Sequence, residues 1–93
     1  MNEKKIEQKL VEMVRKMGGI ALKLISPSYN GMPDRLVLLP KGKIAFIELK
    51  APRKKMRPLQ IRRKKQLESL GFAVYCIDGI QQIRGVIDEI QSS

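Results

Sequence analysis

The segment "DRLVLLPKGKIAFIELK", residues 34–50, determines the predicted fold because it holds two apolar runs separated by a turn. Residues 34–39 and 44–50 are rich in branched apolar side chains, and "PKGK" (40–43) between them has the composition of a turn. The segment therefore predicts an antiparallel β-hairpin. Its second strand is apolar on both faces until Glu48, which indicates a central, covered strand with a charged end.

The carboxylate of Glu48 needs a partner, because burying an unpaired charge is costly. Either Lys50, which lies on the same strand face, pairs with it, or a metal ion does. The hairpin also brings Asp34 to this end. With residues 40–43 as the loop, partner numbers sum to 83 and Asp34 falls opposite Leu49, whereas one bulged residue makes the sum 82 and sets Asp34 opposite Glu48. Carboxylates at opposed positions, with Cβ atoms ~5 Å apart, repel each other unless a divalent cation lies between them.

The other elements follow from periodicity and from helix and turn signals. Two segments are apolar and bounded by turn residues, and we predict them to be strands: 20–26 and 72–78. Three segments carry helical spacing or a helix-start signal, and we predict them to be helices: 4–17, Pro58–Leu70 and 80–91. The order is α-β-β-β-α-β-α in a single domain, residues 1–93. This order predicts an α/β fold.

Composition excludes several classes of site. The chain has no histidine and one cysteine, Cys76, which removes Cys/His zinc sites, serine–histidine triads and an intramolecular disulfide. We expect Cys76 to be a small core residue. Any metal must be held by oxygen, which favours Mg²⁺ or Mn²⁺. No apolar run reaches the ~20 residues of a membrane span, and "MNEKKIEQKL" lacks a signal-peptide core, so we expect a protein of the cytoplasm, or of the nucleus if its source is eukaryotic, with no membrane contact.

The charge of the chain indicates a polyanionic partner. Nineteen Lys and Arg against nine Asp and Glu give a net charge of +10, and nucleic acid is the expected partner of such a protein. Residues 53–65 hold eight basic side chains and no acidic one. The other interpretation of this run is a solvated helix face. We expect phosphate contacts from this run and from the "SPSYNG" loop (26–31), at Arg53, Lys54, Lys55, Arg57, Arg62, Arg63, Lys64 and Tyr29.

The motif residues resemble a known family. "PD" at 33–34, thirteen residues and then "ELK" at 48–50 are similar to the PD-(D/E)XK nuclease motif. The surrounding "GMPDRLVLLPKGKIAFIELKAP", with "RPLQ" and "LGFAVYCID", resembles the VRR-NUC branch of that superfamily in its small stand-alone form from phages and bacteria. The resemblance extends from about Ile6 to Asp78. It implies a restriction-endonuclease-like PD-(D/E)XK core, in which a small mixed β-sheet is flanked by helices, and a cytoplasmic location in a bacterial or phage-infected cell.

The resemblance also implies roles for individual residues. Asp34, Glu48 and the backbone carbonyl of Leu49 would hold the metal, Lys50 would be the catalytic lysine, and Gln60 would be the glutamine of the following helix.

The family further uses a glutamate on its first helix. We assign that role, as a catalytic and metal-binding residue, to Glu7, because Glu7 lies toward the apolar side of the helix. Glu3, one turn earlier, remains an alternative, and so does a plain surface charge at Glu7.

The expected function is Mg²⁺- or Mn²⁺-dependent hydrolysis of DNA phosphodiester bonds. A branched substrate such as a four-way junction fits the resemblance, and a domain this small has little surface for reading base sequence. Symmetric cutting of a junction needs two active sites, which predicts a two-fold homodimer. One alternative is a non-catalytic DNA-binding module, which would not need Asp34 and Glu48 together. Another is an RNA-binding protein, but three of the four aromatic residues fall in predicted strands, which leaves little for base stacking.

Overall fold

The predicted element order is confirmed in a computed structural model, which describes residues 2–93. In chain order the elements are α1 (Glu3–Lys16), β1 (Ile20–Lys23), β2 (Arg35–Leu39), the 3₁₀ turn η1 (Pro40–Gly42), β3 (Lys43–Leu49), α2 (Pro58–Ser69), β4 (Ala73–Ile77), the 3₁₀ turn η2 (Ile80–Gln82) and α3 (Ile83–Ser92). Within residues 2–93, every helix is too short or too polar to cross a lipid bilayer.

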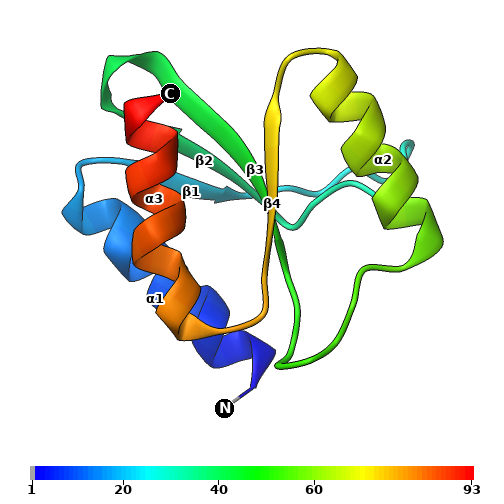
Figure 1. Cartoon of the computed structure of the whole chain (residues 1–93), viewed down its shortest axis with the longest axis horizontal. Coiled ribbons are helices and arrows are strands. Elements are labelled where there is room, and N and C mark those ends of the chain that lie inside the picture. The colour runs from blue at the N-terminus through cyan, green and yellow to red at the C-terminus, as the bar shows by residue number, and fades with distance from the viewer. Residues whose placement is uncertain (1) are drawn as a thin grey trace.

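The four strands form one mixed sheet in the order β1-β2-β3-β4. The first three are antiparallel neighbours, and β4 runs parallel to β3, so the chain must cross over between β3 and β4, and α2 lies in that connection. Figure 1 shows α1 and α3 together on one side of the sheet and α2 on the other. The predicted α/β fold with a mixed sheet flanked by helices (Figure 1) is therefore confirmed, and β3 is a central strand of that sheet, as the sequence predicts.

The main core lies between the sheet and the α1/α3 layer. Asn2 caps α1 by accepting a hydrogen bond from Lys5 N through its side chain, and Gly18, at φ +82°, follows its C-cap. The apolar stripes of α1 and α3 face alternate residues of β2 and β3. The fully buried members of this layer are Ile6, Leu10, Val14, Val37, Ala45, Ile47, Ile77 and Ile87.

The hairpin register resolves the alternatives left by the sequence. Arg35 pairs with Ile47 and Leu39 with Lys43, so partner numbers sum to 82. The register sum of 83 is wrong. The sum of 82 arises because the loop has three residues, with Lys41 at φ 69° and Gly42 at φ 73°, and not because a strand is bulged. Asp34, which directly precedes β2, thus lies opposite Glu48.

Element boundaries differ from the sequence prediction by more than one residue in two places. The first strand ends at Lys23, not Ser26, because its partner β2 begins only at Arg35, and Leu24 makes one last backbone hydrogen bond to Asp34 O at 2.8 Å. The predicted helix over 80–91 is a 3₁₀ turn followed by the α-helix Ile83–Ser92.

The sheet face toward α2 is only partly covered. Strand alternation and register set two rows of apolar side chains across this face: Ile20, Leu38 and Ile44 in one, and Leu22, Leu36, Phe46 and Val74 in the other. Val74 in β4 is buried, but exposure rises toward the free edge, to 44% at Leu22 and 57% at Ile20. Within α2 itself the buried residues are Gln60 and Leu67, so α2 packs more loosely than α1 or α3.

Candidate active site

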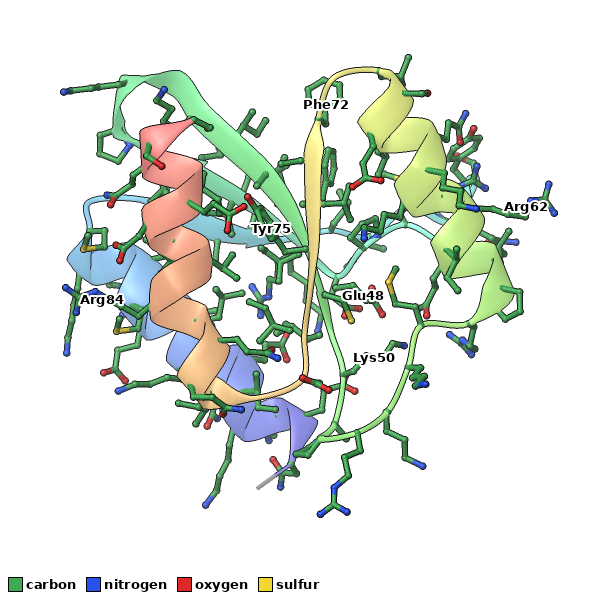
Figure 2. The ribbon with its side chains drawn as sticks, viewed as in Figure 1. Glu48, Lys50, Arg62, Phe72, Tyr75 and Arg84 are labelled. Atoms are coloured by element: carbon green, nitrogen blue, oxygen red, sulfur yellow. The ribbon has the colours of Figure 1, made fainter. Side chains whose placement is uncertain are left out.

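The candidate active site is centred on Glu48, a carboxylate that is only 1% exposed. It lies near the end of β3, on the sheet face toward α2, because alternation sets it on the side opposite to Ile47 and Leu49. Figure 2 shows Glu48 and Lys50 together on this side of the strands. The expected central strand with a charged end is therefore present.

Two polar side chains hold the same oxygen of Glu48. The amide of Gln60 donates from Nε2 to Glu48 Oε2 at 2.8 Å, and Lys50 Nζ lies 3.0 Å from that oxygen. The other oxygen of Glu48, Oε1, is buried and has no hydrogen-bond partner among the described residues. An unpartnered buried polar atom costs about 1–3 kcal/mol, so Oε1 is an acceptor left open for a proton or a cation.

Asp34 supplies a second carboxylate beside Glu48. Its Oδ2 accepts a hydrogen bond from Leu49 N at 2.9 Å, which fixes the carboxylate against the end of β3. Burial, opposed by the hydrogen bond from Lys50 and then reinforced by the charge of Asp34, raises the pKa of Glu48 above its ordinary value. The negative charge of Asp34 therefore disfavours ionisation of Glu48, which is the repulsion between opposed carboxylates that the hairpin register predicts.

Gln60 connects this site to the first turn of α2. Its Oε1 accepts a hydrogen bond from Arg57 N at 2.8 Å while its Nε2 donates to Glu48, and the side chain is 8% exposed. A groove of about 500 Å³ opens beside it, lined by residues of the 26–31 loop and the start of α2. The glutamine implied by the family resemblance thus touches the motif glutamate directly.

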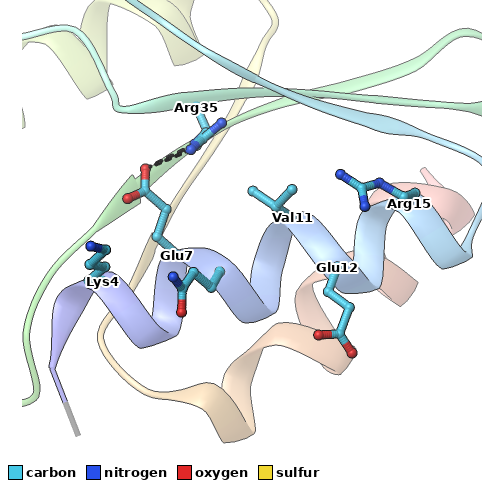
Figure 3. A pocket seen from close by; sticks show the side chains of 7 residues that line it. Lys4, Glu7, Val11, Glu12, Arg15 and Arg35 are labelled. Carbon is cyan, nitrogen blue, oxygen red and sulfur yellow. Dashed lines mark hydrogen bonds and ion pairs between the residues drawn. The ribbon is translucent and has the colours of Figure 1, made fainter.

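Glu7 lies elsewhere, in an ion pair with Arg35. Arg35 Nε and Nη2 are each 3.0 Å from Glu7 Oε2, and Nη1 donates to Ala21 O. Figure 3 shows this pair at a groove along α1, of about 490 Å³. Arg35 belongs to the strand face that packs on α1 and α3, the face opposite to Glu48.

The donor set available to a metal is a pair of acids. Among residues 2–93 no three or more His, Cys, Asp or Glu side chains are grouped so as to hold a metal ion, so the structure does not bring Glu7, or the exposed Glu3, into a cluster with Asp34 and Glu48. The carboxylates of Asp34 and Glu48, with the open Oε1, nevertheless fit a hard divalent cation that prefers oxygen ligands. The roles of Glu7 and of the Leu49 carbonyl stay predictions.

The basic residues divide into two groups. Arg53, Lys54, Lys55, Arg57 and Arg62 are exposed, and Arg62 points away from the sheet in Figure 2. Arg63 and Tyr29 instead contact each other: the Arg63 guanidinium carbon lies 3.8 Å from the centre of the Tyr29 ring. Lys64 is half-buried.

Cys76 was predicted from the sequence to be a core residue, but in the structure it lies beside the candidate active site. It is half-exposed and pairs in register with Glu48 across the parallel β3–β4 ladder. Burial and the carboxylates of Glu48 and Asp78 raise the pKa of the Cys76 thiol, so the thiol is neutral near pH 7. The position could be found only with the β3–β4 register, which the sequence does not define.

Two comparisons match this arrangement to known proteins. A phage protein named "Putative nuclease p44", from Acyrthosiphon pisum secondary endosymbiont phage 1, is 51% identical over 78 residues, which is 84% of this chain and 84% of that protein. A solved structure described as "VRR_NUC domain" superposes with a TM-score of 0.86 at 30% identity, over 92% of this chain and 94% of that chain. The chain belongs to the VRR-NUC family. No protein-family model matches it.

Membership of the VRR-NUC family accounts for the mixed sheet flanked by helices, which is a PD-(D/E)XK nuclease core. In this VRR-NUC chain the "PD" and "ELK" segments converge at one end of the β2–β3 hairpin. The predicted family and fold are both confirmed.

Proposed function

We propose that this VRR-NUC nuclease is a Mg²⁺- or Mn²⁺-dependent DNA endonuclease that cuts branched DNA. The observation that carries the proposal is the open Oε1 of Glu48, buried beside a second carboxylate in a chain of net charge +10. A protein with no need for a cation would gain stability by replacing such an acid with a neutral side chain.

Asp34 and Glu48 would hold the ion, and their own contacts orient them for it. Leu49 N–H fixes Asp34, and Gln60 and Lys50 fix Glu48 through Oε2, which leaves Oε1 toward the ion. When bound, Mg²⁺ or Mn²⁺ would act as a Lewis acid that stabilises the charge building on the phosphate.

Lys50 would add a second positive charge at the same place. Its side chain is 13% exposed and its ammonium is fixed by Glu48, so it is preorganised to stabilise a phosphate oxygen without rearranging in the transition state. The exposed basic side chains of residues 53–62 would contact neighbouring phosphates, which gives affinity without base specificity.

We also propose that two copies associate through the uncovered apolar sheet face. Ile20, Leu22 and Ile44 are 57%, 44% and 38% exposed on that face, and its rows are uncharged in a strongly basic chain. DNA would not bind such a surface, whereas a second copy offers the same surface in a self-complementary two-fold contact. Two copies would supply the two active sites that a four-way junction requires.

The experiment is a cleavage panel with labelled linear, flap and four-way DNA, each with Mg²⁺, Mn²⁺ or EDTA. The proposal predicts metal-dependent cutting that favours the branched substrates, and loss of cutting in Lys50→Ala. Binding without cleavage that is insensitive to EDTA would instead support a non-catalytic DNA-binding module. Metal-dependent cutting that persists in Lys50→Ala would contradict the assigned site.

A further inference from the structure

A cluster of polar contacts joins the β1–β2 loop to α2, and its residues have no role in the reaction proposed above. The loop comprises residues 24–34, ends at Asp34, and reaches α2 in Figure 1, where it is drawn in cyan. Its members Tyr29 and Asn30 meet Arg63 and Gln66 of α2. We call these four residues the loop–helix clasp.

The clasp is densely bonded for a surface feature. Arg63 donates from Nε and Nη2 to Asn30 O at 2.9 and 2.7 Å, and from Nη1 to Gln66 Oε1 at 2.6 Å. The Tyr29 hydroxyl contacts the Gln66 amide at 3.0 and 2.7 Å. The Arg63 guanidinium also lies over the Tyr29 ring. Arg63 Nε, Nη1 and Nη2 all donate to acceptors of the protein itself, which leaves fewer of its N–H groups for a DNA phosphate.

The loop also approaches the α2 backbone closely at Gly31. Its φ is +84°, and a Cβ there would lie 2.8 Å from Leu59 Cγ and 3.1 Å from Leu59 O. Only glycine fits this position without strain. The clasp and this contact therefore bind the loop to residues 59–66 of α2.

The clasp matters because α2 has few other attachments. The buried residues of α2 are Leu67 and Gln60, and residues 51–57, which precede the helix, have no regular secondary structure. Gln60 bonds Glu48 from the start of the helix. Without the clasp, the position of Gln60 relative to the sheet would depend on Leu67, on that one hydrogen bond and on the contact between Gly31 and Leu59.

The contacts form a closed circuit around the metal site. From Glu48 the circuit passes through Gln60 into α2, through the clasp into the loop, and along the loop to Asp34, whose Oδ2 returns to β3 at Leu49 N. We infer that Arg63 and Tyr29 are positioning residues, which set the Asp34–Glu48 geometry for the divalent ion through the clasp. This inference rests on the proposed metal-dependent function.

The test measures Mn²⁺ affinity by calorimetry, and cleavage kinetics, for Arg63→Ala and Arg63→Lys. Substituting a residue that bonds a metal ligand directly lowers affinity or activity by about 10- to 100-fold. Arg63 acts one step further out, through the loop and α2, so we expect a loss of about 10-fold, at the lower end of that range, in Mn²⁺ affinity and in kcat. Arg63→Ala also removes a positive charge, and because like charges repel, that loss alone would strengthen Mn²⁺ binding. Weaker binding in this variant would therefore mean that the positions of Asp34 and Glu48 have changed. Arg63→Lys keeps the charge but not the bidentate contacts with Asn30 O, so it should resemble Arg63→Ala.

Two arginine variants serve as references. Arg84 in α3 is exposed and remote from the site in Figure 2, and Arg84→Ala should keep wild-type Mn²⁺ affinity and kcat. Arg62→Ala, which removes an exposed basic side chain of α2, should raise KM for DNA and reduce its salt dependence without weakening Mn²⁺ binding. An Arg63→Ala variant that behaves like Arg62→Ala, or an Arg63→Lys variant with wild-type Mn²⁺ affinity, would overturn the inference.

Amide hydrogen exchange gives a readout that does not depend on activity. Arg63→Ala should exchange faster over residues 24–34 and 58–69, with the α1 and α3 amides unchanged. Should Arg63→Ala not fold, Tyr29→Phe decides, because it keeps the ring under Arg63 and loses only the contacts with Gln66; unchanged exchange and Mn²⁺ affinity there would overturn the inference. Failure of the wild type to cut any DNA would contradict the proposed function, while Mn²⁺ affinity and exchange would still test the clasp.

Discussion

At the scale of the residue, the site depends on the unusual surroundings of Glu48. Its carboxylate is buried, one oxygen is shared by Lys50 and Gln60, and the other is open. Burial, opposed by the hydrogen bond from Lys50 and reinforced by the charge of Asp34, raises the pKa of Glu48 above the ordinary value. Ionisation of Glu48 therefore costs more free energy in the folded protein than in the unfolded chain.

The raised pKa of Glu48 predicts that the free energy of unfolding depends on pH. A carboxyl group whose pKa is higher in the folded state contributes stability that is fully present below its unfolded pKa, near 4.5, and is lost as pH rises through the folded pKa. Glu48→Gln mimics the protonated form. In EDTA, the thermal midpoint of Glu48→Gln minus that of the wild type should therefore increase as pH rises from the acidic range to neutrality. A difference that stays constant with pH would contradict this account of Glu48.

Residue-level prediction from the sequence worked where the argument was local. Strand alternation sets Glu48 and Lys50 on one face, and hairpin arithmetic gives Asp34 opposite Glu48 as one of two registers. The positions of Arg63 and Tyr29 were not predictable, because they depend on a loop and a helix more than thirty residues apart meeting in space. For the same reason sequence reasoning did not foresee that Arg35 would pair with Glu7.

At the scale of the element, the β1–β2 loop and α2 behave as one unit held by glycine and polar contacts. Gly31 has a positive φ and no room for a Cβ against Leu59. Gly85, in the first turn of α3, has nothing within 4 Å of an added Cβ. The two glycines therefore differ in what an alanine would do.

Gly31→Ala should lower the free energy of unfolding by about 1–3 kcal/mol, the cost of a strained backbone position with a close contact. Gly85→Ala should raise it by about 0.5–1 kcal/mol, because alanine is the better helix former. Urea unfolding followed by circular dichroism measures both changes. Equal effects of the two substitutions would mean that the loop does not approach α2 as described.

Element boundaries show what periodicity leaves undefined. The order and type of the elements follow from apolar spacing and turn residues, and the structure confirms them. The end of β1 at Lys23 does not follow from these signals, because the start of its partner strand β2 determines it. The 3₁₀ turn before α3 also lacked a signal in the sequence, since Ile80 and Ile83 fit helical spacing in either conformation.

At the scale of the whole molecule, charge and apolar surface are separated. The exposed side chains of the basic run, residues 53–65, follow β3 and extend along α2, whereas the uncovered sheet rows near β1 are apolar. Other exposed basic side chains lie outside these rows, for example Lys4 and Arg15 of α1 and Lys23 at the end of β1. A chain of net charge +10 repels its own copies unless an uncharged surface brings them together. The apolar face is the surface suited to that contact.

The proposed dimer predicts a change of mass on one substitution. Leu22→Lys, on the apolar face, should convert a dimeric wild type to a monomer, because two copies would bury like charges against each other. Ile61→Lys changes a residue of similar exposure (41%) on α2 and should remain dimeric. Sedimentation equilibrium distinguishes these states. A wild type that is monomeric throughout the concentration range would contradict the dimer.

The central claim is that Glu48, with Asp34, forms the metal site of this VRR-NUC nuclease, and Mn²⁺ binding tests it most directly. Electron paramagnetic resonance of free Mn²⁺ during titration gives the affinity without any substrate. The account predicts that the wild type binds Mn²⁺ and that Glu48→Gln weakens binding by about 10-fold or more, although Gln is nearly the same size. Equal Mn²⁺ affinity in the wild type and in Glu48→Gln would contradict it.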